Sequence, residues 1–411
     1  MHSLYNVLDK EPHLGSYARS IYLGDPAKPD AGCLTILVSI IRHCPNVDTM
    51  IIACPLTATF SAAIADALLS FTSRRIQTLR WHMSSDAQSR VIWALNALRK
   101  SLVSLDLQFD APTGEGNSLG SAGNLNLALP HLRTLSLRGS FQDFLEQAVD
   151  WSLPALKHVT LDYGRNAHDL PPIDEFCVQH GTNLTYLDLN CLQPIDVAAI
   201  LDLCPNLTTF LFNGDWRLTL SDEHLIESRL TNSPHPSITT IGVHQLRYAF
   251  GVGYIAKSDP FKVNYWQRSN DMNFAALNKR NFPKLRCVRV TSRELLRDLE
   301  SNNGPSQLCV SRWEIWWDQC ARQDVRLEDC TGGLLGTLPQ EELESDDDSD
   351  DEGESDESES DEYEAGGDWQ EENRPPTIQE LRDLLEECRR MSAEADRGDP
   401  VDLELIAALQ M

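Results

Sequence analysis

Positive charge is scarce in this chain of 411 residues. It has 35 Lys and Arg against 62 Asp and Glu, which gives a formal net charge of −27. Residues 341–372 hold 19 of the acidic residues and no Lys or Arg, which leaves a charge of −8 for all the other residues together. The chain as a whole lacks the basic character that phosphate binding requires, so we expect no direct contact with nucleic acid.

Paired cysteine motifs are absent as well. The 11 cysteines are scattered from Cys33 to Cys388, and none forms the C-x-x-C pair that is typical of zinc sites and redox motifs. We therefore expect no metal site and no cofactor. The cysteines are interpreted as small buried hydrophobic residues in a reducing compartment.

Long hydrophobic runs are also missing. The longest apolar stretch, residues 34–41, is far too short to cross a bilayer. The first five residues lack the basic start and the apolar run of a secretion signal. These features predict a protein of the cytoplasm or the nucleus that makes no contact with membranes.

Catalytic motifs are few and are poorly placed. Residues 251–256, Gly-Val-Gly-Tyr-Ile-Ala, match a dinucleotide-binding pattern, but residues 257–261 do not favour the helix that such a site needs. Residues 116–120, Gly-Asn-Ser-Leu-Gly, match the pattern of a hydrolase nucleophile turn, but they lie in a Gly-rich segment that predicts a loop. No Gly-Lys-Ser/Thr segment for phosphates occurs. We therefore expect that the protein is not an enzyme.

What the sequence does contain is a repeated pattern, apolar-x-x-apolar-x-apolar. The copies begin at Leu102, Leu132, Leu156 and Leu184, and, in weaker form, at Val47, Ile76, Leu207, Ile238 and Leu285. Successive intervals from Val47 to Ile238 are 23–31 residues, and the next interval is 47. We expect a copy at Ala18 to open the series and a copy formed by Val310, Trp313 and Ile315 to close it.

The spacing within and between copies predicts the fold. The last two apolar residues of each copy are two apart, so they lie on the same side of a short strand. The intervals leave room for one helix each, and Phe60, Ile64 and Leu68 lie along one helical stripe. One such unit cannot bury its apolar face alone. Residues 1–335 are therefore predicted to form an α/β leucine-rich-repeat solenoid, a horseshoe with a parallel β-sheet on its concave face. The alternative is an ordinary α/β domain with parallel strands.

A family resemblance rests on short phrases within these repeats. Residues 43–47 read His-Cys-Pro-Asn-Val, residues 203–207 read Leu-Cys-Pro-Asn-Leu, and residues 313–317 read Trp-Glu-Ile-Trp-Trp. Together with the irregular repeat lengths, they resemble fungal F-box-like leucine-rich-repeat proteins over roughly residues 1–335. The resemblance implies a substrate-recognition protein related to ubiquitin-ligase receptors. The F-box itself is missing: either the gene model is truncated, or the protein binds its targets without recruiting a ligase core.

Polar residues between the repeated apolar ones are the candidates for binding a protein target on the concave face. They are Arg80, His82, Asp106, Gln108, Arg138, Asp162, Tyr186, Asp188, Asn190 and Asn213. Arg80, Arg138 and Tyr186 are favoured because Arg and aromatic residues most often contribute the binding energy. The tryptophans at 313, 316 and 317 are interpreted as a seal over the last repeat. The aromatic-rich residues 244–284 fit either a degenerate repeat or an insertion.

The C-terminal part differs in composition from the repeats. Residues 336–374 are predicted to be a disordered acidic linker, in which Ser345, Ser349 and Ser358 each have an acidic residue three places later and are candidate phosphorylation sites. Residues 375–411 are predicted to be a short amphipathic helical tail. The protein is expected to be a monomer. As an alternative to substrate recognition, it is an adaptor or chaperone-like binder whose acidic linker engages basic proteins such as histones.

Overall fold

The computed structural model describes residues 2–24, 31–70, 75–110, 119–163, 173–190, 196–214, 230–257 and 260–336. The chain divides into two units, Met1–Glu342 and Leu343–Met411. The described residues all belong to the first unit. The predicted acidic linker, its three serines and the predicted helical tail therefore lie outside the described residues, apart from residue 336.

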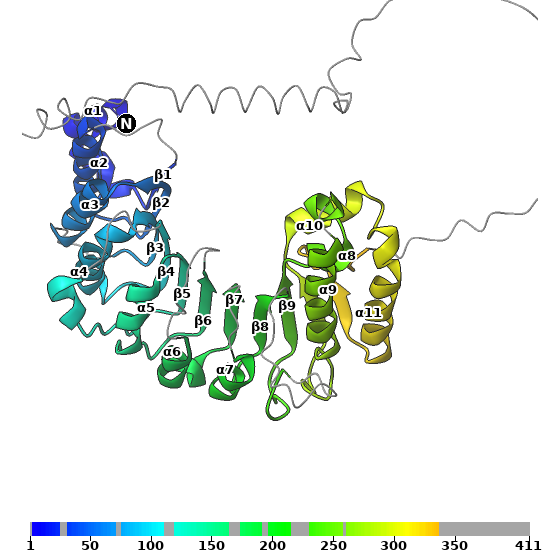
Figure 1. Ribbon diagram of the computed structural model, residues 1–411. Coiled ribbons are helices and arrows are strands. Elements are labelled where there is room, and N and C mark those ends of the chain that lie inside the picture. The colour runs from blue at the N-terminus through cyan, green and yellow to red at the C-terminus, as the bar shows by residue number, and fades with distance from the viewer. Residues whose placement is uncertain are drawn as a thin grey trace, which may run out of the picture. The chain divides into compact units, whose positions relative to one another are not determined.

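The first unit is an α/β structure built on one sheet of 11 parallel strands in chain order, which Figure 1 shows side by side from β1 onward. The strands are β1 (Ser20–Leu23), β2 (Thr49–Leu56), β3 (Thr78–Ser84), β4 (Ser104–Asp110), β5 (Thr134–Gly139), β6 (His158–Asp162), β7 (Tyr186–Asn190), β8 (Thr209–Asn213), β9 (Thr240–His244), β10 (Cys287–Val290) and β11 (Arg326–Glu328). A parallel pair needs a crossover between its strands, and here helices supply most of these crossovers.

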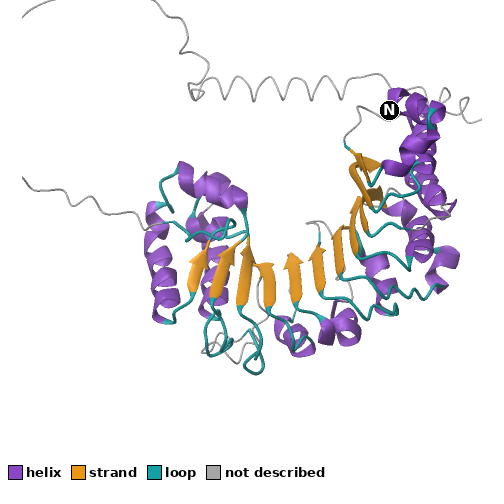
Figure 2. Cartoon of the chain, turned by 180° about the vertical axis from the view of Figure 1, so that it is seen from behind, coloured by secondary structure: helices purple, strands orange, loops and turns teal. Residues whose placement is uncertain are grey.

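The helices lie along one side of the curved sheet and leave the opposite face of the strands without helical cover (Figure 2). The α-helices are α1 (His2–Lys10), α2 (Ala31–His43), α3 (Ala58–Ser70), α4 (Gln88–Leu98), α5 (Gln142–Val149), α6 (Ile173–His180), α7 (Val197–Leu203), α8 (Arg247–Phe250), α9 (Pro260–Ala275), α10 (Arg293–Ser301) and α11 (Val310–Arg322). Short 3-10 helices, among them η3 (Gly120–Asn124) between β4 and β5, complete the connections.

The repeated apolar residues stack in register across the sheet. Leu79, Leu105 and Leu135 are partners on β3, β4 and β5, and the same row continues through the later strands. These three side chains are fully buried. Burial of a leucine stabilises the fold by about 2 kcal/mol, and the rows therefore supply a continuous core between sheet and helices.

The Cys-Pro-Asn phrases join neighbouring repeats. The side-chain amide of Asn46 donates a hydrogen bond of 2.8 Å to the carbonyl oxygen of Ser16, and that of Asn206 donates one of 2.9 Å to the carbonyl oxygen of Thr182. The cysteine that precedes each of these prolines, Cys44 in the first phrase, is buried. Each phrase therefore closes a helix and fixes the next strand to the preceding repeat.

Two sequence expectations at the C-terminal end of the sheet are wrong. The residues expected to close the series, from Val310 to Ile315, belong to helix α11, and the last strand is β11. The error has a physical cause, because apolar residues three apart also occur on one face of a helix, where Trp313 and Trp316 are buried. Residues 257–261 were not expected to begin a helix, but α9 starts at Pro260, and a proline is well tolerated in the first turn.

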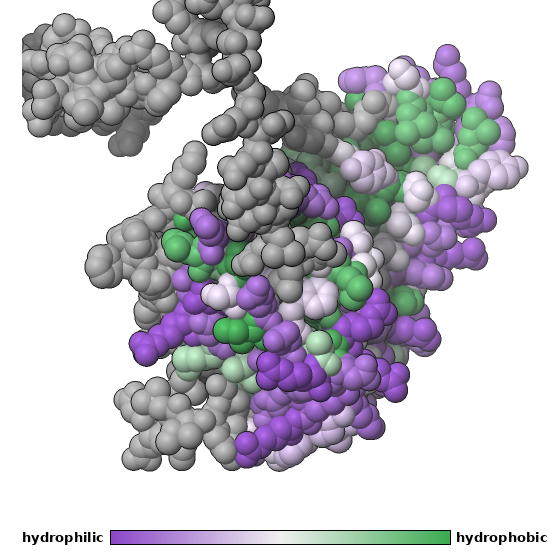
Figure 3. Space-filling model, turned by 90° about the vertical axis from the view of Figure 1, so that its right-hand side faces the viewer, coloured by the Kyte–Doolittle hydropathy of each residue, from purple (hydrophilic) through white to green (hydrophobic). Residues whose placement is uncertain are grey.

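The aromatic-rich interval between β9 and β10 forms α8, η5 (Gly253–Lys257) and α9, and it packs against α11. Phe274 stacks on Trp316 with ring centroids 3.9 Å apart and an interplanar angle of 6°. Phe250 contacts the rings of Trp313 and Trp316 at 4.8 and 5.4 Å. The tryptophans thus connect α11 to both helices of the long interval. Seen from the side of α11, hydrophilic residues cover most of the described surface around smaller hydrophobic areas (Figure 3).

No helix among the described residues is both long enough and apolar enough to cross a membrane.

Candidate functional site

The candidate site is the face of the sheet that the helices leave uncovered. Alternation along each strand places Leu105 and Leu107 in the core and Asp106 and Gln108 on the other face. The parallel register then aligns the polar residues of successive strands in rows, and one row runs from Arg80 through Asp106 to the following strands. We call this surface the open face; it comprises the residues of β2–β10 that alternate with the buried ones.

Opposite charges lie on neighbouring strands at the β3–β5 part of the open face. One carboxylate oxygen of Asp106 lies 3.4 Å from Nε of Arg80 and 3.8 Å from Nη2 of Arg138. The two arginine side chains remain 50% and 39% exposed. Exposed ion pairs of this kind contribute only about 0.2–1 kcal/mol, so both guanidinium groups are free to bind a carboxylate of another molecule at small cost.

His82 and Gln108 lie beside these charges. Nε2 of His82 is 2.8 Å from Oδ1 of Asp110 at the end of β4. In the register, Gln108 pairs with His82 on one side and with Arg138 on the other. This part of the open face offers hydrogen-bond donors, hydrogen-bond acceptors and charges of both signs on three rigid strands.

An amide ladder crosses the strands β6, β7 and β8. Asn190 donates a hydrogen bond of 2.9 Å to Oδ1 of Asp162, and Asn213 donates one of 3.1 Å to Oδ1 of Asn190. Burial raises the pKa of Asp162, against the opposing effects of Arg138 and His244. Asn213 is only 1% exposed, so it holds Asn190 in position through this hydrogen bond but offers no surface to a partner.

A second chain of hydrogen bonds spans β7 to β10. Nε2 of His244 lies 2.7 Å from Oδ1 of Asp188, and Nδ1 of His244 lies 2.8 Å from Oγ1 of Thr291. The hydroxyl of Thr291 also donates to the carbonyl oxygen of Val243 at 3.1 Å. The Thr291 hydroxyl therefore lies within hydrogen-bonding distance of both the imidazole of His244 and a backbone carbonyl, which holds the imidazole in place beside Asp188.

Tyr186 lies next to this chain on the open face. Burial and the neighbouring carboxylate of Asp188, to which the phenol donates a hydrogen bond, raise the pKa of Tyr186 to about 12. Its ring contacts that of His158 edge to face, with centroids 5.7 Å apart. The half-buried tyrosine is therefore a neutral, fixed aromatic group at the centre of the face.

Gly242 on β9 makes room for a side chain of the neighbouring strand. A Cβ at this position would overlap the side chain of Leu211, the residue beside it on β8. Leu211 is itself buried, and it is the register partner of Asp188 on β7. The glycine thus permits a leucine side chain at this position of β8.

Asp188, His244 and Thr291 are residue types that also occur in nucleophilic triads. In such a triad the imidazole accepts the proton of the hydroxyl; here the Thr291 hydroxyl lies 2.8 Å from Nδ1 of His244 and 3.1 Å from the carbonyl oxygen of Val243, a second acceptor for the same proton. The described residues hold no group of three or more His, Cys, Asp or Glu that could bind a metal ion. What the arrangement offers is hydrogen bonding and charge on a rigid surface.

The ten residues proposed from the sequence all lie on the open face, but they differ in exposure. Arg80 is exposed and seven are half-buried; Asp188 and Asn213 are buried. Sequence reasoning missed His244 and Thr291, and also Arg289, whose Nη2 lies 2.6 Å from the buried carboxylate of Glu328. His244 follows the last apolar residue of its copy as Asn190 does, so the same periodicity could have identified it.

In comparisons with known proteins, no family model matches the chain, and no curated protein matches it.

Proposed function

We propose that residues 1–335 are a leucine-rich-repeat solenoid, a horseshoe with its parallel sheet on the concave side, and that the open face recognises another protein without catalysing a reaction. The sequential order of all 11 strands supports the repeat architecture, because each new strand is added beside the previous one. A surface of charged side chains held on rigid neighbouring strands is suited to protein recognition.

The observation that carries this proposal is the pair of exposed guanidinium groups on β3 and β5. Arg80 and Arg138 both lie within 4 Å of the carboxylate of Asp106 and keep 50% and 39% of their side-chain surface exposed. Arginine contributes strongly to protein interfaces because its planar guanidinium group can donate two parallel hydrogen bonds to one carboxylate. The partner is therefore a protein that presents acidic or amide groups to this part of the open face.

The test is a double charge reversal, Arg80→Glu with Arg138→Glu, compared with the matched control Arg90→Glu with Arg322→Glu. Arg90 on α4 and Arg322 on α11 are also exposed and also paired with one carboxylate each. Both variants and the wild type are purified from cells with their bound proteins, which are quantified by mass spectrometry. The proposal expects a defined set of partners to be lost in the first variant and retained in the control. Equal retention in both variants would refute it.

The finer assignment, an F-box-like substrate receptor, rests on the Cys-Pro-Asn phrases and the resemblance of residues 1–335. It expects that the adaptor of a ubiquitin ligase is recovered together with the targets of the open face. If targets are recovered and the adaptor never is, the receptor assignment is rejected while protein recognition remains.

A second candidate function is favoured by the 19 acidic residues of 341–372. A run of this charge attracts basic proteins such as histones at low ionic strength. Deletion of residues 341–372 should then abolish the capture of purified core histones at low salt. Capture that is unchanged by the deletion would exclude this role.

A further inference from the structure

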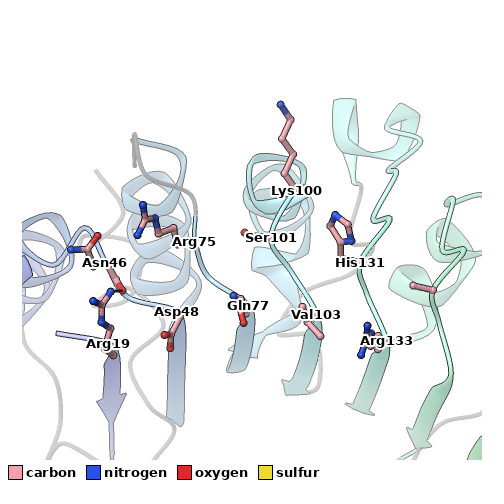
Figure 4. Close-up of a pocket in the computed structure, with 11 residues that line it drawn as sticks. Arg19, Asn46, Asp48, Arg75, Gln77, Lys100, Ser101, Val103, His131 and Arg133 are labelled. Carbon is pink, nitrogen blue, oxygen red and sulfur yellow. Dashed lines mark hydrogen bonds between the residues drawn. The ribbon is translucent and has the colours of Figure 1, made fainter. Parts of the chain in front are cut away.

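A groove lies along the edge of the sheet at which the strands begin. It has a volume of about 710 Å³ and extends along the starts of β1 to β5 as far as Ala155, which precedes β6 (Figure 4). Its lining residues are Arg19, Asn46, Asp48, Arg75, Gln77, Lys100, Ser101, Val103, His131, Arg133 and Ala155. Since none of the open-face residues lines it, this strand-start groove is separate from the candidate site above.

The backbone fixes the positions of the groove residues at regular intervals. The carbonyl oxygen of Arg19 accepts two hydrogen bonds from the repeat that follows, and those of Asp48, Gln77 and Val103 do the same. This ladder places successive lining residues one strand spacing apart, about 4.8 Å. The five strand starts therefore extend over roughly 19 Å, which corresponds to about six residues of an extended peptide.

Positive charge is concentrated in the groove. Four side chains that are always cationic near neutral pH (Arg19, Arg75, Lys100 and Arg133) line it, against the single carboxylate of Asp48. Arg75, Lys100 and Arg133 are exposed, and none of them forms an ion pair with another described residue. In a chain with a net charge of −27, three unpaired cations beside one another mark a place that favours an anionic ligand.

The neutral lining residues indicate what kind of anion fits. Asn46, Gln77 and Ser101 offer amide and hydroxyl groups that can hydrogen-bond to a peptide backbone. Phe, Tyr and Trp are absent from the lining, so the groove lacks the stacking platforms that single-stranded nucleic acids use. The carboxylate of Asp48 can accept a backbone N–H of a peptide, whereas the sugar-phosphate backbone of DNA offers no donor.

From this combination, we propose that the strand-start groove binds an acidic peptide segment of a partner protein in extended form, with its carboxylates on Arg75, Lys100 and Arg133. This site is additional to the open face and does not depend on the function proposed for that face. Because its cations are exposed, the affinity must fall as the ionic strength rises.

The test uses the full-length chain and a fluorescein-labelled hexaglutamate peptide, with binding followed by fluorescence anisotropy at low salt. The triple variant Arg75→Gln, Lys100→Gln, Arg133→Gln removes the groove cations. The control variant Lys284→Gln, Arg293→Gln, Arg297→Gln removes three exposed cations near β10 and α10, and it changes the net charge equally. The proposal expects at least a tenfold loss of affinity in the groove variant and less than a twofold change in the control.

The variant Asp48→Asn is expected to bind the peptide more tightly, a result that a misfolded protein would not give. The asparagine oxygen can still accept the hydrogen bond from the Thr49 hydroxyl, which is 2.9 Å in the native protein. Removal of the only carboxylate in the groove should tighten hexaglutamate binding several-fold. Unchanged or weaker binding in Asp48→Asn would contradict the proposal, as would equal losses in the two triple variants.

Two further probes identify the class of ligand. Inorganic phosphate at equal charge should compete far less well than unlabelled hexaglutamate, because one phosphate ion is too small to contact cations along the whole groove. A hexathymidine oligonucleotide should also bind more weakly than hexaglutamate. If the oligonucleotide binds more tightly, or if phosphate competes equally, the assignment to an acidic peptide is wrong.

Discussion

His244 and Asp188 lie 56 positions apart in the sequence, yet Nε2 of the imidazole is 2.7 Å from Oδ1 of the carboxylate. The two residues belong to β9 and β7, so the contact passes across β8. Thr291, directly after β10, extends the chain to a fourth strand. A side-chain contact of this length fixes the relative positions of repeats that share no backbone hydrogen bonds.

The first prediction concerns this contact. The side chain of Asp188 is 11% exposed, so His244→Ala leaves the carboxylate without its imidazole partner in a place where water reaches it poorly. The free energy of unfolding should fall by about 1–3 kcal/mol, measured by urea denaturation. His82→Ala is the control, because its partner Asp110 is 46% exposed, and it should cost less than about 1 kcal/mol. Equal losses of unfolding free energy in the two variants would contradict a larger contribution from the contact between His244 and Asp188.

The second prediction is a pH dependence caused by two buried histidines. Burial lowers the pKa of His180 and of His235, whose Nε2 atoms lie 3.2 and 3.0 Å from the carbonyl oxygens of Ala148 and Cys204. The unfolded chain therefore binds more protons than the folded one as the pH falls below about 6.5, and stability should decrease there.

The double variant His180→Gln, His235→Gln checks this dependence. Glutamine can still donate to both carbonyls but does not titrate. Urea denaturation between pH 8.5 and 5.5 should show a smaller loss of stability for the variant than for the wild type on the acid side, with parallel behaviour above pH 7.5. If the two curves remain parallel throughout, the histidines do not cause the acid sensitivity.

The third prediction concerns Gly139 at the end of β5. Its φ angle is +78°, and a Cβ there would overlap the carbonyl oxygen of Phe109 on the neighbouring strand. Gly139→Ala should therefore destabilise the protein by at least about 2 kcal/mol. Gly120→Ala is a matched control, because its φ is +54° but nothing lies within 4 Å, so that it should cost only about 1 kcal/mol. Thermal unfolding of both variants separates the steric clash from the backbone strain.

The fourth prediction concerns the stacked pair Phe274 and Trp316, which joins the long interval to α11. Both side chains are buried, and Trp316→Ala should lower the free energy of unfolding by about 3–5 kcal/mol. Trp317→Ala, at a half-buried position one residue away, should cost clearly less. If Trp317→Ala costs more stability than Trp316→Ala, the stacked pair is not the main contact between α11 and the long interval.

The apolar pattern was sufficient to predict the strands, because residues such as Leu105 and Leu107 alternate with polar ones wherever one face of a sheet is buried. It was not sufficient at Val310, because an apolar spacing of three suits a strand entry and a helix face equally. The contact of His244 with Asp188 could not be predicted either. It joins β9 to β7 across the intervening strand β8, whereas the repeat pattern predicts pairing only between neighbouring strands.

The strand-start groove was missed for a different reason. Its residues, such as Arg19 and Arg133, occupy the position just before each strand, where the repeat pattern sets no residue type. The overall charge of −27 also argued against a basic site. A net charge describes the electric field at a distance, whereas the three exposed cations of the groove, which pair with no other described residue, define a local surface.

Protein recognition by the open face is tested most directly by photo-crosslinking in cells. The photoreactive residue p-benzoylphenylalanine is placed at Arg80, which is 50% exposed on the open face, or at Arg90, which is 57% exposed on helix α4. The account predicts discrete crosslinked partners from position 80 and none of these partners from position 90. The same products from both positions, or products from position 90 alone, would contradict it.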